Sequence, residues 1–431
     1  MSYLPSIGDQ PTIPLPIEIY EQIIDSVGIG VGARDYVVSV ARATLCSCCL
    51  TCQAWLPRSR ALLYKSITLK APRPSDLQIS FQKLVRTILD SPLIAALVEN
   101  ITLSELSASK SGVASVLPIL LIGRLPHLRT FTIHETTLVV SPGFCSSISS
   151  FPALETLKLA TVMFPNISAF RRLLTALPRL RDLTLDNVFW QTVGAVPETM
   201  IQYIGSMPPI RRLSVIGGQV VGPATWAVLE LLAPYLEQLI FSDWNQDKLL
   251  APNKEENMLQ FPRLVSLTFR AHPRPLARGF SDFLSKAEAQ QLRVINLINR
   301  MMLKSTSDLP TMSRRLLRNS PLFERVVTQA RLPALEAVNM VVEVWDLSGR
   351  IVEELEQRMP TIAEECREKL GVLHRRGILR VIGVNLVDDK INASWFWLGP
   401  SRSLPSQYSC IWQYGVPLLD AITIVLGSNT L

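Results

Sequence analysis

The chain has 431 residues, of which 48% are hydrophobic and 18% are charged, and its formal net charge at pH 7 is +7. This composition excludes wholesale disorder, and the length exceeds what one compact core usually organises, so several domains or a solenoid are expected. Seven Cys residues without a secretory-type leader predict a reducing compartment, cytoplasmic or nuclear, and no apolar run approaches the length of a membrane span.

The chain opens with a predicted flexible tail at residues 1–12, and a small helical domain is expected over residues 13–70. The first helix begins near Pro16 and Glu18, which suit the first turn of a helix. Apolar residues recur every four residues along this helix, so one of its faces is expected to be packed. They are Leu15, Ile19, Ile23 and Val27, with Ile24 beside them.

Two more helices are expected in this domain. The glycines within residues 28–32 break the first helix, a second helix is predicted over about residues 37–56, and a third follows Pro57. Three helices of this length bury little surface by themselves. Apolar residues left over are therefore expected to contact a partner.

Three segments of this domain form a further pattern: LPIEIYEQII, which starts at Leu15, CLTCQAWLPR, which starts at Cys49, and LYKSI, which starts at Leu63. Together they resemble an F-box, in the F-box-like form frequent in basidiomycete fungi. The sequence departs from the pattern between Gly28 and Thr44, where it is longer and richer in glycine. That departure affects the expected spacing of the second helix.

The resemblance implies docking on a Skp-type adaptor, which joins F-box proteins to a cullin scaffold and a RING-bound ubiquitin-conjugating enzyme. An alternative for each apolar residue is a place in the core of the helical domain. The positions that match adaptor-facing residues are Leu15, Pro16, Ile19, Ile23, Ile24 and Leu50. The positions expected in the core of the F-box are Cys52 and Trp55.

Nine segments between residues 95 and 340 share one spacing of apolar residues. Seven fit the pattern x-P-x-L-x-x-L-x-L, and two, from Ala95 and Ala289, fit it without the Pro. Successive segments start 26 to 30 residues apart until the last step, which is 43 residues. A recurrence of this length predicts stacked units, none of which can bury its apolar edge alone. The seven begin at Leu125, Phe151, Leu177, Met207, Ala233, Phe261 and Leu332.

Each unit is expected to be a short strand followed by a helix. The end of the pattern alternates with period two, as in a half-buried strand. The segment ISAFRRLLTA after Asn166 places Ile167, Phe170, Leu173 and Leu174 on one helical face. Right-handed repetition of strand and helix then gives parallel strands side by side.

The array resembles leucine-rich repeat proteins, in the longer style seen in ubiquitin-ligase receptors, over about residues 95–297. The consensus Asn after the strand is not at a constant position: Asn187 and Asn245 come closest. The backbone groups there are therefore expected to be satisfied by other means. The predicted fold class is α/β: an N-terminal three-helix F-box followed by an irregular leucine-rich-repeat solenoid with helices on the convex side.

The solenoid is assigned to residues 71–345, with a basic insertion near residues 300–331, and residues 346–431 are expected to hold a helix and a capping region. That helix is predicted to be interrupted at Pro360.

Strand residues that face away from the core form the expected contact surface for a protein substrate. The charged candidates are Lys158, Asp182, Asp186, Arg212 and Arg270.

The stretch from Arg263 to Arg331 is strongly basic, with 13 Lys and Arg against four acids. Such a block can meet nucleic acid or a phosphoprotein. It lacks the interleaved aromatic residues that stack on bases, so nucleic acid is an unlikely partner. A solvated face is the favoured interpretation.

No constellation of residues predicts catalysis, a metal or a cofactor. The four Cys residues from Cys46 to Cys52 lack the second pair of a zinc knuckle, and on a helix Cys46 would point away from the other three. Packing as small apolar residues is the favoured role. No phosphate-binding loop, nucleophile elbow or His-Glu-x-x-His motif occurs.

We therefore expect a non-catalytic substrate-recognition subunit of an SCF-type cullin–RING ubiquitin ligase. The helical domain would bind the Skp-type adaptor, and the repeats would bind a protein substrate. Two alternatives stay open at this point. One is a repeat scaffold without a ligase role, and the other is a basic module that binds phosphoprotein or nucleic acid.

Overall fold

The structure is a computed structural model that divides into two compact units. One lies within Met1–Ile67 and the other within Thr68–Ser406. The two units are described separately below. The described residues are 16–29, 35–71, 74–105, 113–191, 207–217, 223–242, 258–271, 280–281, 283–303, 320–330, 332–346, 352–387 and 396–397.

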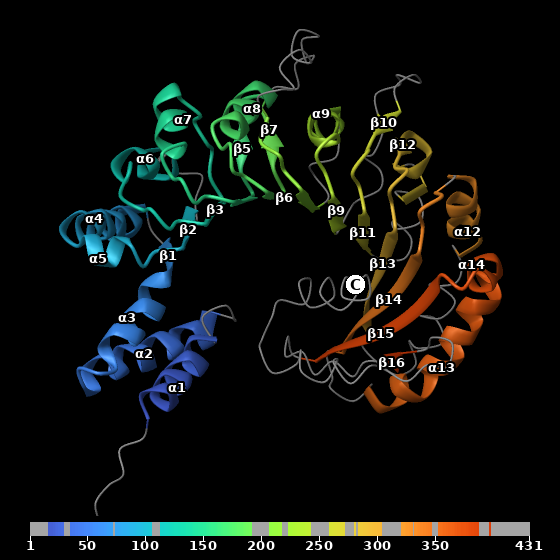
Figure 1. The fold of residues 1–431 in the computed structure, drawn as a ribbon, viewed down its shortest axis with the longest axis horizontal. Coiled ribbons are helices and arrows are strands. Elements are labelled where there is room, and N and C mark those ends of the chain that lie inside the picture. The colour runs from blue at the N-terminus through green and yellow to red at the C-terminus, as the bar shows by residue number, and fades with distance from the viewer. Residues whose placement is uncertain are drawn as a thin grey trace, which may run out of the picture. The chain divides into compact units, whose positions relative to one another are not determined.

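The first unit contains three helices, α1 (Ile17–Ile29), α2 (Asp35–Thr51) and α3 (Leu56–Lys65), which are blue in Figure 1. Ile24 from α1 and Leu45 from α2 are completely buried between them. The second helix ends at Thr51, earlier than expected, because the chain turns there before Pro57 begins the next helix. The third helix is also shorter than the apolar pattern suggested, since a strand starts at Ser66.

The second unit is built on one twelve-stranded sheet in the order β1-β2-β3-β4-β6-β8-β9-β11-β13-β14-β15-β16. From β2 to β15 each strand pairs in parallel with the next, and β16 is antiparallel to β15. The strands are β1 (Ser66–Ala71), β2 (Asn100–Glu105), β3 (Thr130–His134), β4 (Thr156–Ala160), β6 (Asp182–Asp186), β8 (Arg212–Ile216), β9 (Gln238–Ser242), β11 (Ser266–Ala271), β13 (Val294–Leu303), β14 (Ala337–Asp346), β15 (Leu379–Val387) and β16 (Phe396–Trp397).

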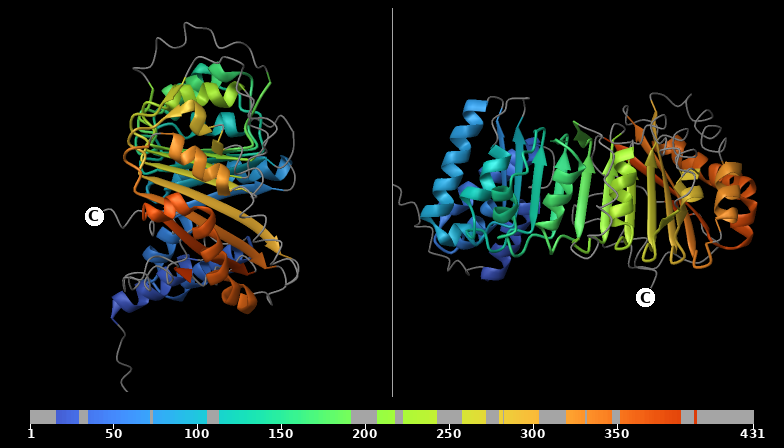
Figure 2. Two further views of the ribbon diagram at one scale, coloured as in Figure 1. Left: turned by 90° about the vertical axis from the view of Figure 1, so that its right-hand side faces the viewer. Right: turned by 90° about the horizontal axis from the view of Figure 1, so that it is seen from above.

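Helices cover the outer face of this curved sheet, and the strands line its inner face (Figures 1 and 2). Two further pairs of short strands lie beside the main sheet: β5 (Met163–Phe164) with β7 (Phe189–Trp190), and β10 (Leu259–Gln260) with β12 (Ala287–Glu288). The predicted mixed α/β architecture with a long parallel sheet is confirmed. The helices of this unit are α4 (Pro74–Asp90), α5 (Pro92–Ala95), α6 (Val113–Leu120), α7 (Pro142–Ile148), α8 (Ile167–Thr175), α9 (Pro223–Leu232), α12 (Ser320–Gln329), α13 (Val352–Lys369) and α14 (Gly371–Arg375).

Helix α8 shows how the helix of one repeat is capped and packed. Asn166 caps its N-terminus, where the side-chain oxygen accepts a 2.9 Å hydrogen bond from the backbone N–H of Ala169. Phe170, Leu173 and Leu174 are fully buried on the face that was predicted to pack. The repeat pattern therefore predicted both the strand and the packed face of the helix that follows it.

The Pro of the repeat lies in a tight turn that leads into each strand. In several repeats the carbonyl of the residue before Pro accepts a hydrogen bond from the N–H two residues after Pro, as between Leu177 and Leu180 at 3.0 Å, whereas the N–H of Ile210 donates to the carbonyl of Pro208 itself. Pro fits the second position of such a turn because its φ is already fixed there. The same bond forms between Ala289 and Leu292 at 3.2 Å, so this turn does not depend on Pro.

A left-handed residue follows four of the short strands at the same repeat position. Its N–H continues the ladder by donating to the last carbonyl of the next strand, at distances from 2.6 to 3.0 Å. This bond satisfies a backbone donor that would otherwise be unpaired at the strand end, where no constant Asn is available. The four residues are Glu135 (φ 55°), Thr161 (φ 53°), Asn187 (φ 48°) and Gly217 (φ 86°).

Two expectations for the C-terminal part differ from the structure. The sheet extends beyond residue 345, because β15 pairs in parallel with β14. Helix α13 also runs through Pro360 without interruption. Buried Ile362, Ala363 and Cys366 pack the half that follows the proline, and this packing offsets the backbone hydrogen bond that Pro360 cannot donate.

Several predictions fall on residues that are not described, among them the tail at residues 1–12 and nearly all of the C-terminal capping region that was expected after the last helix. Most of the basic insertion near residues 300–331 is also outside the described residues, apart from the end of β13 and helix α12. No helix in the described part of the chain is both long and apolar enough to cross a bilayer.

Candidate interaction surfaces

The helical unit leaves apolar side chains on its surface. Ile19 and Ile23 of α1 are 38% and 46% exposed, and Leu50 near the end of α2 is 87% exposed. Ile24, in contrast, is fully buried, so it contributes to the core of the unit and not to its surface. Pro16 is exposed, and Leu15 lies outside the described residues.

Two further exposed apolar residues were not among the predicted set. Ile17 is 45% exposed and Val40 is 48% exposed. Both lie on the same two helices as the predicted residues. The expected spacing of the second helix was uncertain in sequence because of the glycine-rich stretch, and this explains why Val40 was missed.

An ion pair connects the first and third helices. Arg58 donates from Nε and Nη2 to the two carboxylate oxygens of Asp25, each at 2.6 Å. This bidentate bond raises the pKa of the Arg58 guanidinium. Both side chains are about 40% exposed, so the pair adds little stability. Its main effect is to orient α1 against α3.

Trp55 and Cys52 occupy different environments, although both were expected in the core. Trp55 is half-buried in the turn before α3, and its ring lies 5.5 Å from that of Tyr20. Cys52 is exposed. The difference arises because α2 ends at Thr51, so Cys52 leaves the helical face that carries the buried Leu45 and Cys48.

The open half of the strand face lies on β4, β6 and β8. Lys158 is exposed at the centre of β4, and Asp182 and Asp186 are half-buried on β6. Arg212 of β8 donates a 2.9 Å hydrogen bond to Oε1 of Gln238 and lies 3.7 Å from Oδ1 of Asp182. The parallel register therefore brings four of the five predicted contact residues onto three neighbouring strands.

His134 lies at the end of β3 on this face. Burial of the ring lowers its pKa below 6.5, and Lys70 and Lys158 contribute in the same direction. The carboxylates of Glu135 and Asp186 act in the opposite direction but do not compensate. The ring is thus held predominantly neutral at neutral pH.

The fifth predicted contact residue, Arg270 of β11, is not on an open surface. Its side chain is 10% exposed, and its Nε and Nη2 donate to Oε2 of the fully buried Glu343 at 3.1 and 2.9 Å. Arg300 of β13 donates to the same oxygen at 3.3 Å. Arg270 is therefore a member of a buried ion cluster, and we no longer count it among the substrate contacts.

A chain of side-chain hydrogen bonds lies on the same three strands, two residues from Arg270 and four residues from Arg300 and Glu343. Asn339 donates to Asn296 at 2.8 Å, and Asn296 donates to the hydroxyl of Thr268 at 3.0 Å. All three residues are buried and share one row of the sheet. Polar residues at alternate positions in the two ten-residue strands were the only sequence signal for this cluster.

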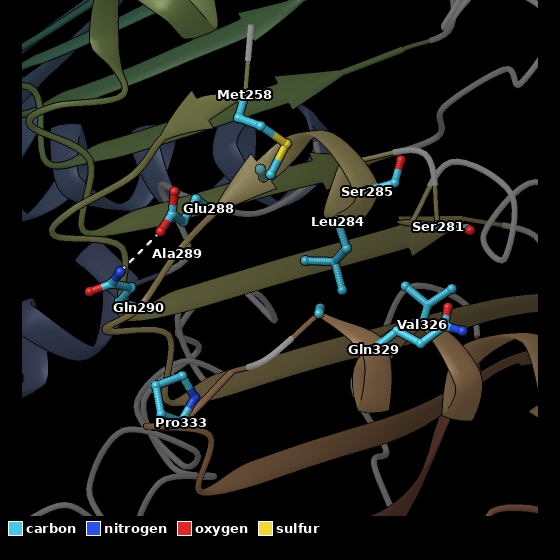
Figure 3. Close-up of a pocket in the computed structure, with 12 residues that line it drawn as sticks. Met258, Ser281, Leu284, Ser285, Glu288, Ala289, Gln290, Val326, Gln329 and Pro333 are labelled. Carbon is cyan, nitrogen blue, oxygen red and sulfur yellow. Dashed lines mark hydrogen bonds between the residues drawn. The ribbon is translucent and has the colours of Figure 1, made fainter. Parts of the chain in front are cut away.

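A cavity of about 790 Å³ opens next to the longest step of the repeat array. Figure 3 shows Leu284 and Val326 on its apolar side, with Glu288 and Gln290 at the opposite side. Gln260 and Gln290 donate to the two carboxylate oxygens of Glu288 at 2.7 and 3.0 Å, and these bonds lower its pKa. Among the described residues, those that line the cavity include two serines and Glu288 but no histidine or cysteine.

The described cysteines do not form a metal site. Cys46 and Cys52 are exposed, Cys49 is half-buried and Cys48 is buried. Within the described residues, no group of three or more His, Cys, Asp or Glu side chains is arranged to hold a metal ion.

Comparison of the chain with models of known protein families and with curated proteins finds no match. The geometry of the two surfaces therefore carries the functional argument.

Proposed function

We propose that this protein is a substrate-recognition subunit of an SCF-type cullin–RING ubiquitin ligase. In this proposal it performs no chemistry. The helical unit binds a Skp-type adaptor, and the strand face with its flanking loops binds a protein substrate. Tethering raises the effective concentration of substrate lysines near the ubiquitin-conjugating enzyme.

The observation that carries the proposal is the apolar surface of the helical unit. Ile19, Ile23 and Leu50 remain exposed although the unit has a packed core of Ile24, Leu45 and Cys48. Large apolar side chains left exposed on a unit this small favour a protein partner. Each would contribute about 1 to 2 kcal/mol if a partner buried it completely.

The two surfaces supply different kinds of contact. The predicted adaptor-facing positions that are exposed on the helices of this unit are aliphatic (Ile19, Ile23 and Leu50), which suits a constant partner bound by burial of apolar area. The open half of the strand face mixes Lys158, Asp182 and Arg212 with hydroxyl groups, and these charges largely balance. Polar groups arranged in this way favour selection among partners more than affinity.

Binding of the purified full chain to a fungal Skp-type adaptor tests the proposal. The double variant Ile19→Asp, Ile23→Asp places two charges on the exposed positions and should weaken binding at least about 100-fold. Val116→Asp is the matched control, because Val116 is 41% exposed on α6 of the repeat unit. Circular dichroism of each variant shows whether the helices remain folded.

Each outcome separates the proposal from its alternatives. Wild-type binding that the double variant loses and the control keeps would support the ligase subunit. A folded wild-type chain that does not bind the adaptor would contradict it and favour a scaffold without a ligase role. Binding of the wild type to nucleic acid with a steep dependence on salt would favour the basic module instead.

A further inference from the structure

Two thiols of α2 lie one helical turn apart on its solvent side. Cys46 and Cys49 are separated by three residues, a spacing that places side chains on the same helical face, so the expectation that Cys46 points away from Cys49 is wrong. Cys46 is exposed and Cys49 is half-buried, whereas Cys48 points into the core with Leu45. Leu50 follows Cys46 by four residues and belongs to the same face.

Among the other thiols, Cys46 makes the largest charge contribution to the pKa of Cys49. Burial raises the pKa of the Cys49 thiol, and the charge of Cys46 is the next largest contribution in the same direction. Arg60 and a hydrogen bond to Ser59 act in the opposite direction without reversing the shift. The pair therefore interacts across the turn, and all of the cysteines that the structure describes are free thiols.

We propose that Cys46 and Cys49 form a reversible disulfide by exchange with a small disulfide such as glutathione disulfide. The exposed Cys46 thiolate attacks one sulfur of glutathione disulfide, the bond between its sulfurs breaks, and one glutathione thiolate leaves. The Cys49 thiolate then attacks the Cys46 sulfur of the mixed disulfide and releases the second glutathione. Two protein thiols are oxidised, and one glutathione disulfide is reduced to two glutathione thiols.

The other thiols of this helix are less suited to pair with Cys49. Cys48 is buried on the opposite side of the helix. Cys52 lies after Thr51, the last residue of α2, and it makes no contribution to the charge environment of Cys49. Burial raises the pKa of the Cys49 thiol, so little of it is thiolate. Attack of Cys49 on the mixed disulfide is therefore the slow step, and it accelerates as the pH rises.

The disulfide would change the surface that carries Leu50. Side chains three residues apart on a helix have their Cβ atoms about 5 to 6 Å apart, whereas a disulfide needs about 3.5 to 4.5 Å. The turn between Cys46 and Cys49 must therefore tighten toward 3₁₀ geometry, in which such side chains eclipse. If the proposed function holds, oxidation should weaken binding of the adaptor about tenfold through displacement of Leu50.

Peptide mapping of the full chain tests the site itself. The chain is equilibrated with glutathione and glutathione disulfide at several ratios. Acid then stops the exchange, and an alkylating reagent blocks the free thiols. The peptide Ala43–Arg58 is sequenced by mass spectrometry. We expect one internal disulfide between Cys46 and Cys49, which is absent in Cys46→Ser and in Cys49→Ser but present in Cys52→Ser. Only mixed disulfides with glutathione, or a disulfide that persists in Cys46→Ser, would overturn the proposal.

Adaptor binding is measured on the same samples. Weaker binding of the oxidised wild type, with unchanged binding of Cys46→Ser under the same conditions, would establish the regulatory role. A disulfide that forms without any change in binding would overturn that role and leave the modification site in place. If reduced protein does not bind the adaptor, the proposed function fails, while the peptide map still decides whether the disulfide forms.

Discussion

Two groups of strands in the sheet are built from the same repeat but end in different ways. Strands β3, β4, β6 and β8 have five residues each and stop at a left-handed residue. Strands β13 and β14 have ten residues each and continue past that point. In β13 the position equivalent to the left-handed residue is Asn299, which is paired with Ala271 and Val342 in extended conformation.

The difference shows that strands with the same apolar pattern can have an inner face that is exposed or one that is buried. Where strands are short, the inner face carries exposed or half-buried polar groups such as Lys158 and Asp182. Where strands are long, the same face is closed and contains Glu343 with Arg270 and Arg300. The short half is therefore available for contacts with other proteins, and the long half is a second packed region whose polar groups must satisfy one another.

Removal of the carboxylate from the long half should have the largest effect. Glu343→Gln removes the buried carboxylate to which Arg270 and Arg300 donate, and it should lower the free energy of unfolding by about 3 kcal/mol or more. Urea denaturation followed by circular dichroism measures the change. The matched control is Glu336→Gln, since Glu336 forms a half-exposed pair with Arg293 at 3.8 Å and should change stability by less than about 0.5 kcal/mol. Equal effects of the two variants would contradict the distinction between the halves.

The left-handed turn of the short half can be broken at Gly217. An alanine Cβ there would lie 2.3 Å from Oδ1 of Asn187, at a φ of +86° that disfavours any side chain. We expect Gly217→Ala to destabilise the protein by about 1 to 3 kcal/mol. Gly143→Ala in α7 is the control: its Cβ meets nothing closer than 3.9 Å, and it should stabilise the protein by about 0.5 to 1 kcal/mol. Destabilisation by both variants to the same degree would show that the turn is not the cause.

The same turn can be relaxed at Thr161. This β-branched residue has a φ of 53°, and its N–H donates to the carbonyl of Asp186 at 2.6 Å. Thr161→Gly keeps the hydrogen bond and removes the steric cost of the left-handed conformation, so we expect a gain of about 0.5 to 1 kcal/mol. The midpoint of urea unfolding should rise. A clear loss of stability would mean that the threonine side chain has a packing role that outweighs its backbone strain.

The smallest expected effect is a pH dependence that arises from His134. Its folded-state pKa is lowered below 6.5 by burial, so the unfolded chain binds more protons than the folded chain between the two pKa values. The stability contribution is therefore fully present above pH 6.5 and is lost as the pH falls through that window. His134→Gln should flatten the pH dependence of the unfolding free energy in this range. A steeper dependence in the variant than in the wild type would contradict the assigned direction.

The fold of the short half could be predicted from sequence because each strand and helix depends on local spacing. The segment at Leu177, for example, fixes both a turn and the strand β6 by its apolar positions. The end of each strand could not be predicted, because the left-handed residues Glu135, Thr161, Asn187 and Gly217 share a conformation and no residue type. Their common feature is a backbone hydrogen bond to the next repeat, which a linear pattern does not record.

The buried cluster could not be predicted for a different reason. Arg270, Arg300 and Glu343 lie on three strands, and Glu343 follows Arg270 by 73 residues. Sequence reasoning placed Arg270 correctly on the inner face but could not determine what covers it. Similarly, Ile23 and Ile24 are adjacent in α1 and equally apolar, and only the packing of α2 against α1 decides that Ile24 is buried.

Hydrogen–deuterium exchange of the full chain with and without a Skp-type adaptor tests the central claim that the two surfaces have separate partners. The account predicts added protection in peptides from α1 and from the end of α2 that contains Leu50, with no change in β4, β6 and β8. Protection confined to the strands, or no protection anywhere under conditions in which both proteins are folded, would contradict it.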